Sequence, residues 1–306
     1  MPMMEGLESL ATRWISRWAE PRAEAVEATR GLTPAVVITG GSSGIGLALA
    51  HEFARHSQAV VLIARTPSRL ETAAIEILQR QPNVRVEQLS LDISRPEAIE
   101  VLSSWLAEKR LYCDVLVNNA AIGHSGPFSA APTTRLETLI ATNVAAVARL
   151  TRAVLPDMIA RGRGGILTIS SLGALIPGPH QAAYYASKAF ALSLTEAIAS
   201  EAAGRGVRIA VVLPGPVETR FHARMDAEGS LYRHILAAAT PERVAALSVR
   251  SYRLGRRVIA PGLVPTLAVP FLRILPHAVS VPIVNWLLDT GRPALRSDED
   301  KSSPLL

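Results

Sequence analysis

Cysteine is nearly absent from this chain of 306 residues, because Cys113 is the only one. A single cysteine excludes an intrachain disulfide framework and zinc clusters that need several thiolates. Such a chain suits a reducing compartment, and we expect a cytoplasmic protein. Cys113 lies just before an apolar run typical of a buried strand, so an inert core thiol is a better interpretation than a nucleophile.

The chain also lacks blocks of like charge, although its formal net charge is +6 at pH 7. A positive excess favours anionic cofactors, nucleic acid or an acidic membrane surface. The arginines are scattered and no long basic run occurs, which argues against nucleic acid as a partner. The 7 histidines show no helix-spaced metal pattern, so we expect no metal site.

Long hydrophobic runs are missing as well. No stretch reaches about 18 uninterrupted apolar residues, so the sequence predicts no clear membrane-spanning helix. Glu5, Glu8 and Arg13 interrupt the N-terminal residues, which do not resemble a secretory signal. Apolar residues nevertheless make up 49% of the chain and charged residues 19%, which is enough for a sizeable core.

The chain does contain a regular alternation of short apolar runs and helical stretches. We expect strands at 35–39, 59–63, 84–89, 114–118, 165–170 and 207–213, and a last strand through Val258 and Ile259. We expect helices at 44–56, 67–80, 95–109, 133–161 and 181–203. This alternation predicts an α/β fold: one doubly wound parallel sheet of the Rossmann type, with helices on both faces, in a domain over residues 34–262.

A glycine-rich turn follows the first apolar run. Its pattern is T-G-x-x-x-G-x-G, formed by Gly40, Gly44 and Gly46 around Ser42, Ser43 and Ile45. Glycine permits a tight turn and lets the backbone approach a pyrophosphate, and the following helix presents N–H groups to anionic oxygens. The strand before the turn and the helix after it favour a dinucleotide site over a purely structural turn.

A second pattern suits proton transfer. Tyr184 and Lys188 lie four residues apart on one helical face, and Ser171 precedes Tyr184 by 13 residues. A free phenol has a pKa of about 10, too high for an efficient base at neutral pH, but a neighbouring ammonium lowers it. Ser171 could stabilise charge on a substrate oxygen, with Ser170 as the alternative. Tyr185 is the rival phenol, three residues from Lys188.

Together these residues resemble the short-chain dehydrogenase/reductase family over roughly residues 34–262. The segment 118–121 resembles the family's N-N-A-G element with alanine at its last position, and 214–219 resembles its P-G-x-V-x-T element. The resemblance selects Tyr184 and Ser171 over their neighbours. It implies catalytic roles for Asn143, Ser171, Tyr184 and Lys188, and cofactor contacts from the glycine turn, Asp92, Asn118, Tyr184, Lys188, Pro214, Gly215, Val217 and Thr219.

Some of these roles are specific. By resemblance, Asp92 contacts the adenine, Thr219 contacts the nicotinamide carboxamide, and Asn143 holds a water that links Lys188 to solvent. Hydride transfer between a nicotinamide and a carbonyl or hydroxyl carbon is the reaction expected, with Tyr184 as acid and base. The second strand ends in Ala64-Arg65-Thr66 and carries no acid for a ribose hydroxyl, whereas Arg65 could bind a 2′-phosphate, assisted by Arg69 or Ser42. We therefore expect a preference for NADP(H) over NAD(H).

The substrate is less well defined. Residues 219–240 are expected to form a lid, and their apolar members are Phe221, Met225, Leu231, Tyr232, Ile235 and Leu236. They suggest a hydrophobic ketone or alcohol that is lipid-like, steroid-like or acyl-like. His124 and His180 are candidate pocket residues, whereas His51 and His56 are expected on the surface of the helix at 44–56. The alternatives are a non-catalytic regulatory protein that binds nucleotide and a scaffold at a membrane surface.

Two extensions flank the domain. Within residues 1–33, the segment 5–20 predicts an amphipathic helix that packs on the domain or a second subunit, or lies at a membrane interface; mixed charges on its polar face favour packing. Residues 263–306 are apolar and then polar, and prolines argue against one continuous helix there. A broken apolar hairpin could cover the substrate site, form a subunit contact or contact a bilayer. By family resemblance we expect a homo-oligomer formed through the helices at 133–161 and 181–203.

Overall fold

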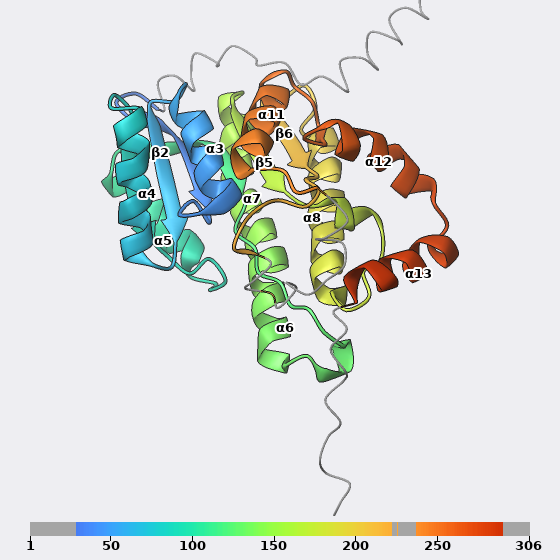
Figure 1. The fold of residues 1–306 in the computed structure, drawn as a ribbon. Coiled ribbons are helices and arrows are strands. Elements are labelled where there is room, and N and C mark those ends of the chain that lie inside the picture. Colours follow the sequence, from blue (N-terminus) through green and yellow to red (C-terminus); the bar gives the residue numbers. More distant parts are fainter. Residues whose placement is uncertain (1–28, 222–224, 226–236, 290–306) are drawn as a thin grey trace, which may run out of the picture.

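Seven parallel strands form one sheet in the order β3-β2-β1-β4-β5-β6-β7 (Figure 1). The computed structural model describes residues 29–221, Met225 and residues 237–289. The strands are β1 (Thr33–Thr39), β2 (Ala59–Ala64), β3 (Arg85–Ser90), β4 (Leu111–Asn118), β5 (Gly164–Ile169), β6 (Val207–Val212) and β7 (Val258–Ile259). The chain winds outward from β1 to β3 and then restarts beside β1 at β4. This reversal creates a crevice at the carboxyl ends of the strands, and the predicted doubly wound sheet is confirmed.

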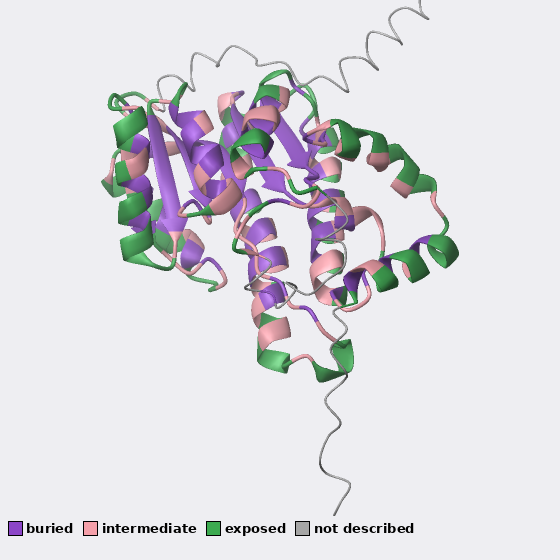
Figure 2. Cartoon of the chain, in the orientation of Figure 1, coloured by how far each residue is buried: buried purple, intermediate pink, exposed green. Residues whose placement is uncertain are grey.

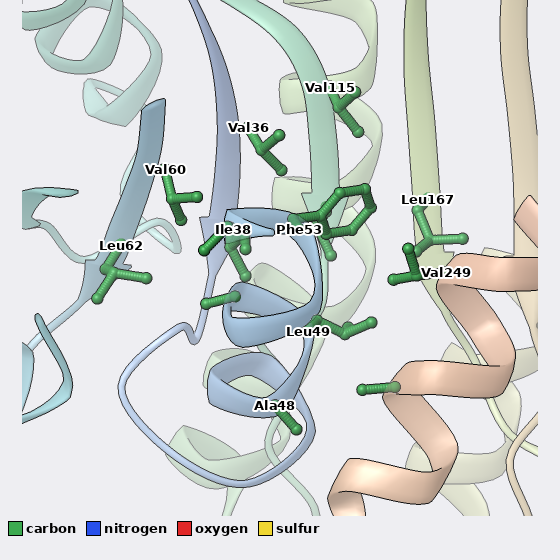
Figure 3. Packing of buried hydrophobic residues seen from close by; sticks show 14 of the residues in the cluster. Val36, Ile38, Ala48, Leu49, Phe53, Val60, Leu62, Val115, Leu167 and Val249 are labelled. Carbon is green, nitrogen blue, oxygen red and sulfur yellow. The ribbon is translucent and has the colours of Figure 1, made fainter. Parts of the chain in front are cut away.

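Helices cover both faces because successive strand residues point to opposite sides. One face carries α3 (Gly44–Ala54), α4 (Pro67–Arg80) and α11 (Pro241–Arg253), and the other carries α5 (Ala98–Glu108), α7 (Ala146–Arg161) and α8 (Ala182–Glu201). On the first face Ile38 packs with Leu49 and Phe53 of α3 and Val249 of α11 (Figure 3). Apart from the edge strand β3, the long strands are buried on both sides, which explains why they read as continuous apolar runs.

One long helical stretch contains a local irregularity. Helix α6 (Thr133–Ile140) continues through a π-helical turn at Ala141–Ala145 into α7. The stretch Thr133–Arg161 is long and apolar enough, by length and composition, to cross a membrane. The expectation that no such segment exists depended on uninterrupted apolar runs and was too strict. Since Ala146, Leu150 and Met158 of this stretch pack in the core, it is part of the α/β fold.

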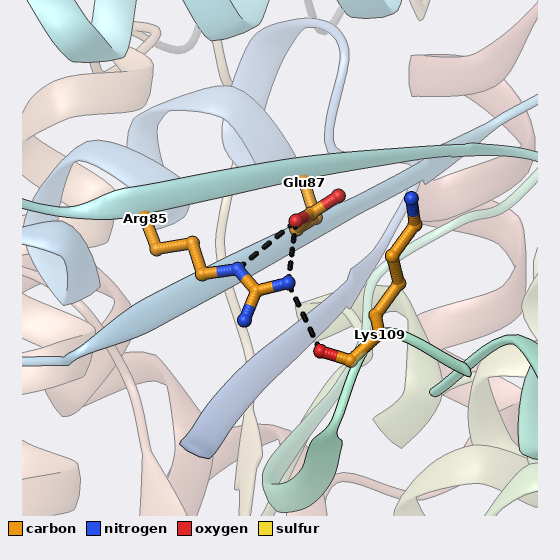
Figure 4. A network of polar contacts seen from close by, with 3 residues as sticks. All are labelled: Arg85, Glu87 and Lys109. Atoms are coloured by element: carbon orange, nitrogen blue, oxygen red, sulfur yellow. Dashed lines mark hydrogen bonds and ion pairs between the residues drawn. The ribbon is translucent and has the colours of Figure 1, made fainter. Parts of the chain in front are cut away.

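The edge strand β3 carries charged side chains that form a hydrogen-bond network. Arg85 donates to Oε1 of Glu87 on the same strand, at 2.7 and 2.9 Å, and its Nη2 also donates to the carbonyl of Lys109 at 3.0 Å (Figure 4). Lys109 follows α5, so these bonds tie the edge of the sheet to the connection that leads into β4. Charges of this kind on an edge strand oppose edge-to-edge pairing with another sheet.

The C-terminal part of the described chain forms two short helices beside the domain. Helix α12 (Leu263–Ile274) and helix α13 (His277–Leu288) meet at Leu275 and Pro276, and both stand at one side of the sheet near α8 (Figure 1). Arg273 of α12 bonds Glu196 of α8 at 2.9 Å. Much of the surface of both helices is exposed (Figure 2). We call α12 and α13 with their connection the apolar hairpin.

Three parts of the chain differ from the expected fold or lie outside the described residues. Helix α11 was missed, although Thr240 caps it, Pro241 opens it, and its buried positions recur every three or four residues. His51 was expected on the surface of α3 but is buried, with Nε2 lying 3.0 Å from Glu76 of α4. The predicted N-terminal helix at 5–20 and most of the expected lid lie outside the described residues.

Candidate active site

The crevice at the carboxyl ends of the strands holds a cavity of about 1940 Å³. Most of the residues predicted from sequence line it together. They are Gly40, Ser42, Ser43, Gly44, Ile45, Gly46, Arg65, Asp92, Ser171, Tyr184, Lys188, Pro214, Gly215, Val217 and Thr219. Asn118 and Asn143 are the two that do not reach the wall. Residues from six separate segments of the chain therefore converge on one space.

The glycine turn between β1 and α3 has the geometry of an anion site. Gly40 and Gly44 have φ values of 67° and 56°, which favour glycine. A Cβ at Gly46 would overlap the carbonyl oxygen of Gly40 and the side-chain amide of Asn119, so the turn closes only without one. The Ser43 side chain makes no capping bond to α3. The amides of the first turn of α3 are thus suited to phosphate oxygens, and this cradle fits a dinucleotide.

Two neighbouring asparagines divide between the wall and the interior. The Asn119 side chain donates to the backbone carbonyl of Thr39 at 2.9 Å, and the backbone amide of Asn119 donates to Thr39 Oγ1 at 3.0 Å. These bonds hold the ends of β1 and β4 together below the glycine turn. Asn118 is buried and donates to Thr151 Oγ1 of α7 at 3.0 Å. The geometry therefore gives Asn119 the place at the cavity wall, and the side chain of Asn118 supports the fold behind it.

Where the cavity meets the ends of β2 and β3, it carries one carboxylate and one guanidinium, Asp92 and Arg65. Asp92 follows β3, and its Oδ1 accepts from the amide and hydroxyl of Ser94 at 3.0 and 2.7 Å. Burial opposes ionisation of Asp92, but these bonds and the charges of Arg65 and Arg95 lower its pKa overall. Arg65 is exposed at the end of β2, where no acidic residue is found. The end of the cavity nearest β2 thus presents an unhindered guanidinium.

Lys188 is held in place by burial and one backbone bond. Its Nζ donates to the carbonyl of Ile169 at 2.9 Å and lies 5.7 Å from the centre of the Tyr184 ring. The lysine is only 5% exposed, and this burial lowers its pKa to about 8. At pH 7 the amine is still mostly protonated. It therefore brings a positive charge next to the Tyr184 phenol, as the spacing of the two residues predicts.

Ser171 and Ser170 have different surroundings at the end of β5. Ser171 Oγ accepts from the amide of Gly173 at 3.1 Å. An acceptor role towards Gly173 leaves the hydroxyl hydrogen of Ser171 available to a substrate oxygen. Ser170 is nearly fully buried, and its hydroxyl donates to the backbone carbonyl of Lys188 at 2.7 Å. Both serines line the cavity, but the Ser170 hydroxyl hydrogen is used by the Lys188 carbonyl, so the geometry supports Ser171 as the donor to a substrate.

Asn143 lies in the π-helical turn, behind the cavity wall. Its side chain exchanges two bonds with the backbone of Ile122, at 2.9 and 2.8 Å, and also donates to Ser187 Oγ at 3.0 Å. Ser187 in turn donates to the carbonyl of Tyr184 at 2.7 Å. Asn143 therefore links the segment after β4 to the helix that carries Tyr184. Its role in holding a water remains a prediction. A π-helical turn is frequent at functional sites.

The other half of the cavity is apolar. The Phe221 ring lies 5.4 Å from the Tyr184 ring. The apolar hairpin contributes many of the remaining wall residues, among them Leu263, Val264, Ala268, Phe271, Leu272, Leu275, Ile283, Val284, Leu287 and Leu288. His124 and His180 are not among the wall residues. Sequence reasoning gave a cover for the substrate site only as one of three roles for this hairpin.

Polar contacts in the apolar half are few. Gln181, at the start of α8, lines the cavity, and its Nε2 is buried without a partner among the described residues. Within the same residues, no cluster of three His, Cys, Asp or Glu side chains could hold a metal ion. The cavity thus joins an anion-binding end, a proton-transfer group and an apolar compartment.

Comparison with known proteins agrees with this geometry. The family model for short chain dehydrogenases matches residues 34–229. A short chain dehydrogenase of Pseudocercospora fijiensis is 38% identical over 204 residues, which cover 65% of this chain and 64% of that protein. A very-long-chain 3-oxoacyl-CoA reductase of Bos taurus is 31% identical over 220 residues, which cover 71% of this chain and 64% of that protein. The match thus spans less than two thirds of either relative.

Solved structures show the same architecture over most of their length. A short-chain dehydrogenase from Sphingobium yanoikuyae in complex with NADPH superposes with a TM-score of 0.69 at 28% identity, covering 80% of this chain and 97% of that one. An alcohol dehydrogenase from Thermococcus sibiricus complexed with 5-hydroxy-NADP superposes with a TM-score of 0.64 at 28% identity, covering 74% of this chain and 95% of that one. The fold resemblance therefore includes nearly all of each known domain.

Proposed function

The chain belongs to the short-chain dehydrogenase family, and from that premise we propose that it is an NADP(H)-dependent oxidoreductase that interconverts a ketone and a secondary alcohol on a hydrophobic, acyl-like substrate. The observation that carries the proposal is the shared cavity. Its wall contains the glycine turn at one end, Ser171, Tyr184 and Lys188 in the middle, and the apolar hairpin at the other end.

The chemistry follows from the surroundings of these side chains. When NADP(H) is bound by the glycine turn and Thr219, it supplies or accepts the hydride. In reduction, the Tyr184 phenol donates its proton to the carbonyl oxygen while Ser171 donates a hydrogen bond to the same oxygen. The positive charge of Lys188 favours the resulting phenolate. In oxidation, the phenolate removes the proton from the alcohol, and Ser171 keeps the oxygen in place.

The preference for NADP(H) is supported by the end of β2. Arg65 lies exposed there beside the cavity, and β2 ends in Ala64-Arg65-Thr66 without the carboxylate that would bind a ribose hydroxyl and repel a phosphate. A guanidinium can bind a 2′-phosphate through two parallel hydrogen bonds. Solved relatives that were crystallised with NADPH or 5-hydroxy-NADP are consistent with this choice.

The acyl-like substrate class is supported by the apolar wall and by the relatives named very-long-chain 3-oxoacyl-CoA reductase. The test measures NADPH oxidation with 3-oxoacyl-CoA thioesters of increasing chain length, with NADH in parallel. We expect kcat/KM to rise with chain length and to be higher with NADPH. Turnover that is independent of chain length would remove the apolar compartment from substrate binding. Tight NADPH binding without turnover would support a non-catalytic nucleotide-binding protein.

We also propose that the protein is cytoplasmic and that its apolar hairpin makes a peripheral contact with a membrane surface. Its exposed surface includes Leu263 (74% exposed), Ile274 (80%) and Trp286 (59%), and Phe271 lies both on this surface and at the cavity wall. Exposed aromatic and aliphatic side chains on short helices are typical of interfacial binding. A hydrophobic substrate could then pass from the bilayer into the cavity without crossing water.

Liposome co-sedimentation tests this contact. The double substitution Phe271→Ser with Trp286→Ser should reduce binding to phosphatidylcholine–phosphatidylserine vesicles. The control is Ile75→Ser on α4, which removes an equally exposed aliphatic side chain on another helix and should leave binding unchanged. Equal binding by all three proteins would exclude the hairpin as the contact.

A homo-oligomer is the third part of the proposal. Phe190 of α8 and Ile140 of α6 are large exposed apolar side chains on the two helices expected to form subunit contacts. Light scattering on the purified protein should give at least a dimer, and Phe190→Asp should lower the molar mass. A monomeric wild-type protein would contradict the proposed homo-oligomer.

A further inference from the structure

Tyr185, the residue after the proposed acid–base tyrosine, packs its ring against the segment that joins β5 to α8. Two glycines of that segment touch it. A Cβ at Gly173 would lie 2.8 Å from Cε1 of Tyr185, and a Cβ at Gly178 would overlap Cγ and both Cδ atoms of the same ring. Neither glycine has a positive φ. Glycine is therefore required at both places by the close approach of the Tyr185 ring, and not by backbone conformation.

The contact with Gly173 leads directly to Ser171. The amide of Gly173 donates to Ser171 Oγ at 3.1 Å, and this is the bond that leaves the serine hydrogen directed elsewhere. The adjacent Leu172 amide donates to the carbonyl of Pro214 at 3.0 Å, which fixes the start of the segment to the strand end beside it. A shift of Gly173 would therefore move the donor that sets the direction of the Ser171 hydroxyl.

The other end of the segment is tied to the helix that carries both tyrosines. The Gln181 amide donates to the carbonyl of Gly178 at 3.1 Å, and the Tyr185 amide donates to the carbonyl of Gln181 at 3.0 Å. The rings of Tyr184 and Tyr185 lie 6.1 Å apart at 76°. Being adjacent in α8, they point in different directions: the Tyr184 ring lies against Phe221, whereas the Tyr185 ring packs against the segment, and both residues line the cavity.

We propose that Tyr185 is a positioning residue for the reaction: its ring clamps Gly173 and Gly178 and thereby fixes the Ser171 hydroxyl relative to the Tyr184 phenol. The inference rests on the proposed function, since it assigns Ser171 and Tyr184 to one substrate oxygen. The ring is the working part because every close contact with the two glycines is made by ring carbons. The hydroxyl group of Tyr185 is not required for the clamp.

The principal test compares Tyr185→Phe with Tyr185→Leu, using NADPH and a long-chain 3-oxoacyl-CoA. The Phe variant keeps the ring and should retain the kcat of the wild type. The Leu variant removes the ring and should lower kcat by up to about 10²-fold, the effect of a small misplacement of a catalytic group, while the Kd for NADPH stays unchanged. In a Ser171→Ala background, Tyr185→Leu should lower kcat little further, because Ser171 transmits the effect.

A second pair of measurements does not depend on turnover. Amide hydrogen exchange in residues 171–181 should accelerate in Tyr185→Leu and stay as in the wild type in Tyr185→Phe. Gly178→Ala keeps Tyr185 but displaces its ring, so it should lower kcat and accelerate exchange in the same segment. If the wild type turns over no carbonyl substrate, the proposed function fails while the exchange result still tests the clamp.

Three results would overturn the inference. A Leu variant with the kcat and exchange of the wild type would show that the ring positions nothing. A loss of kcat in Tyr185→Phe as large as in Tyr185→Leu would assign the effect to the Tyr185 hydroxyl. Parallel losses of NADPH binding and kcat in Tyr185→Leu and Gly178→Ala would show a general structural role instead of one directed at Ser171.

Discussion

The two halves of the cavity are built in different ways. The cofactor half uses backbone groups from the glycine turn and the polar ends of β1, β2 and β4, all held in the sheet by short hydrogen bonds. The substrate half uses side chains from α8, the segment before it and the apolar hairpin, and much of that hairpin faces solvent. A cradle built from backbone groups thus lies beside an apolar compartment built from side chains. This suits one constant cofactor and a substrate whose identity side chains determine.

The largest effect is expected where the two halves meet. Tyr184→Phe should lower kcat by about 10²–10⁴-fold, because it removes the proton donor and leaves the ring in place. NADPH affinity should remain close to that of the wild type. The matched control is Tyr185→Phe, the same change one residue further along α8, which should keep turnover. Equal activity in both variants would take Tyr184 out of the reaction.

The next effect belongs to the cofactor half. In Gly46→Ala the new Cβ meets the Gly40 carbonyl and the Asn119 amide, so we expect a loss of about 3 kcal/mol in the free energy of unfolding and weaker NADPH binding. Gly204→Ala is the control, since no atom lies near its Cβ but its φ is 76°. Chemical denaturation measures the free energy of unfolding, and a fluorescence titration measures the affinity for NADPH. The control should lose some stability and no NADPH affinity.

Cofactor choice should respond more weakly. Arg65→Ala should reduce the preference for NADPH over NADH by about 10-fold or more, the value of one or two lost hydrogen bonds to a charged group. Arg95→Ala is the control, because Arg95 also lowers the pKa of Asp92 but does not line the cavity. The measurement is the ratio of kcat/KM with NADPH to kcat/KM with NADH, in the wild type and in both variants. A similar change in both variants would assign the effect to Asp92.

The most gradual effect, small within any one pH unit, concerns Lys188 and pH. Its pKa in the folded protein is lowered to about 8 from 10.5, so between these values the unfolded chain holds a proton that the folded chain has lost. Without cofactor, the stability of the wild type should therefore rise relative to Lys188→Met by about 1 kcal/mol per pH unit across this window. Urea denaturation at several pH values tests it. Parallel curves for both proteins would show that burial does not perturb Lys188.

Sequence reasoning was most successful where function depends on neighbours in the chain. The glycine turn, the pair Tyr184–Lys188 and the strand ends were all predicted, because a turn, a helical repeat and an apolar run are local patterns. It could not anticipate the packing of side chains: Asn119 lines the cavity whereas the Asn118 side chain bonds Thr151, and His51 is covered by α4. A cofactor contact from Asn118 stays a prediction.

Contacts between segments that are distant in the sequence could not be predicted either. The hairpin wall around Phe271 and the Tyr185 ring under Gly173 and Gly178 arise only from tertiary structure. Helix α11 is different, since its cap and its periodicity were present in the sequence and were overlooked.

The most direct test of the account follows the hydrogen itself. NADPH with deuterium in place of both hydrogens at C4 is incubated with a long-chain 3-oxoacyl-CoA, and the product is analysed by mass spectrometry. We predict a 3-hydroxyacyl-CoA that carries one deuterium on the carbinol carbon, formed by the wild type and nearly absent with Tyr184→Phe. Saturating NADPH binding with no deuterated alcohol from any apolar ketone would contradict the account.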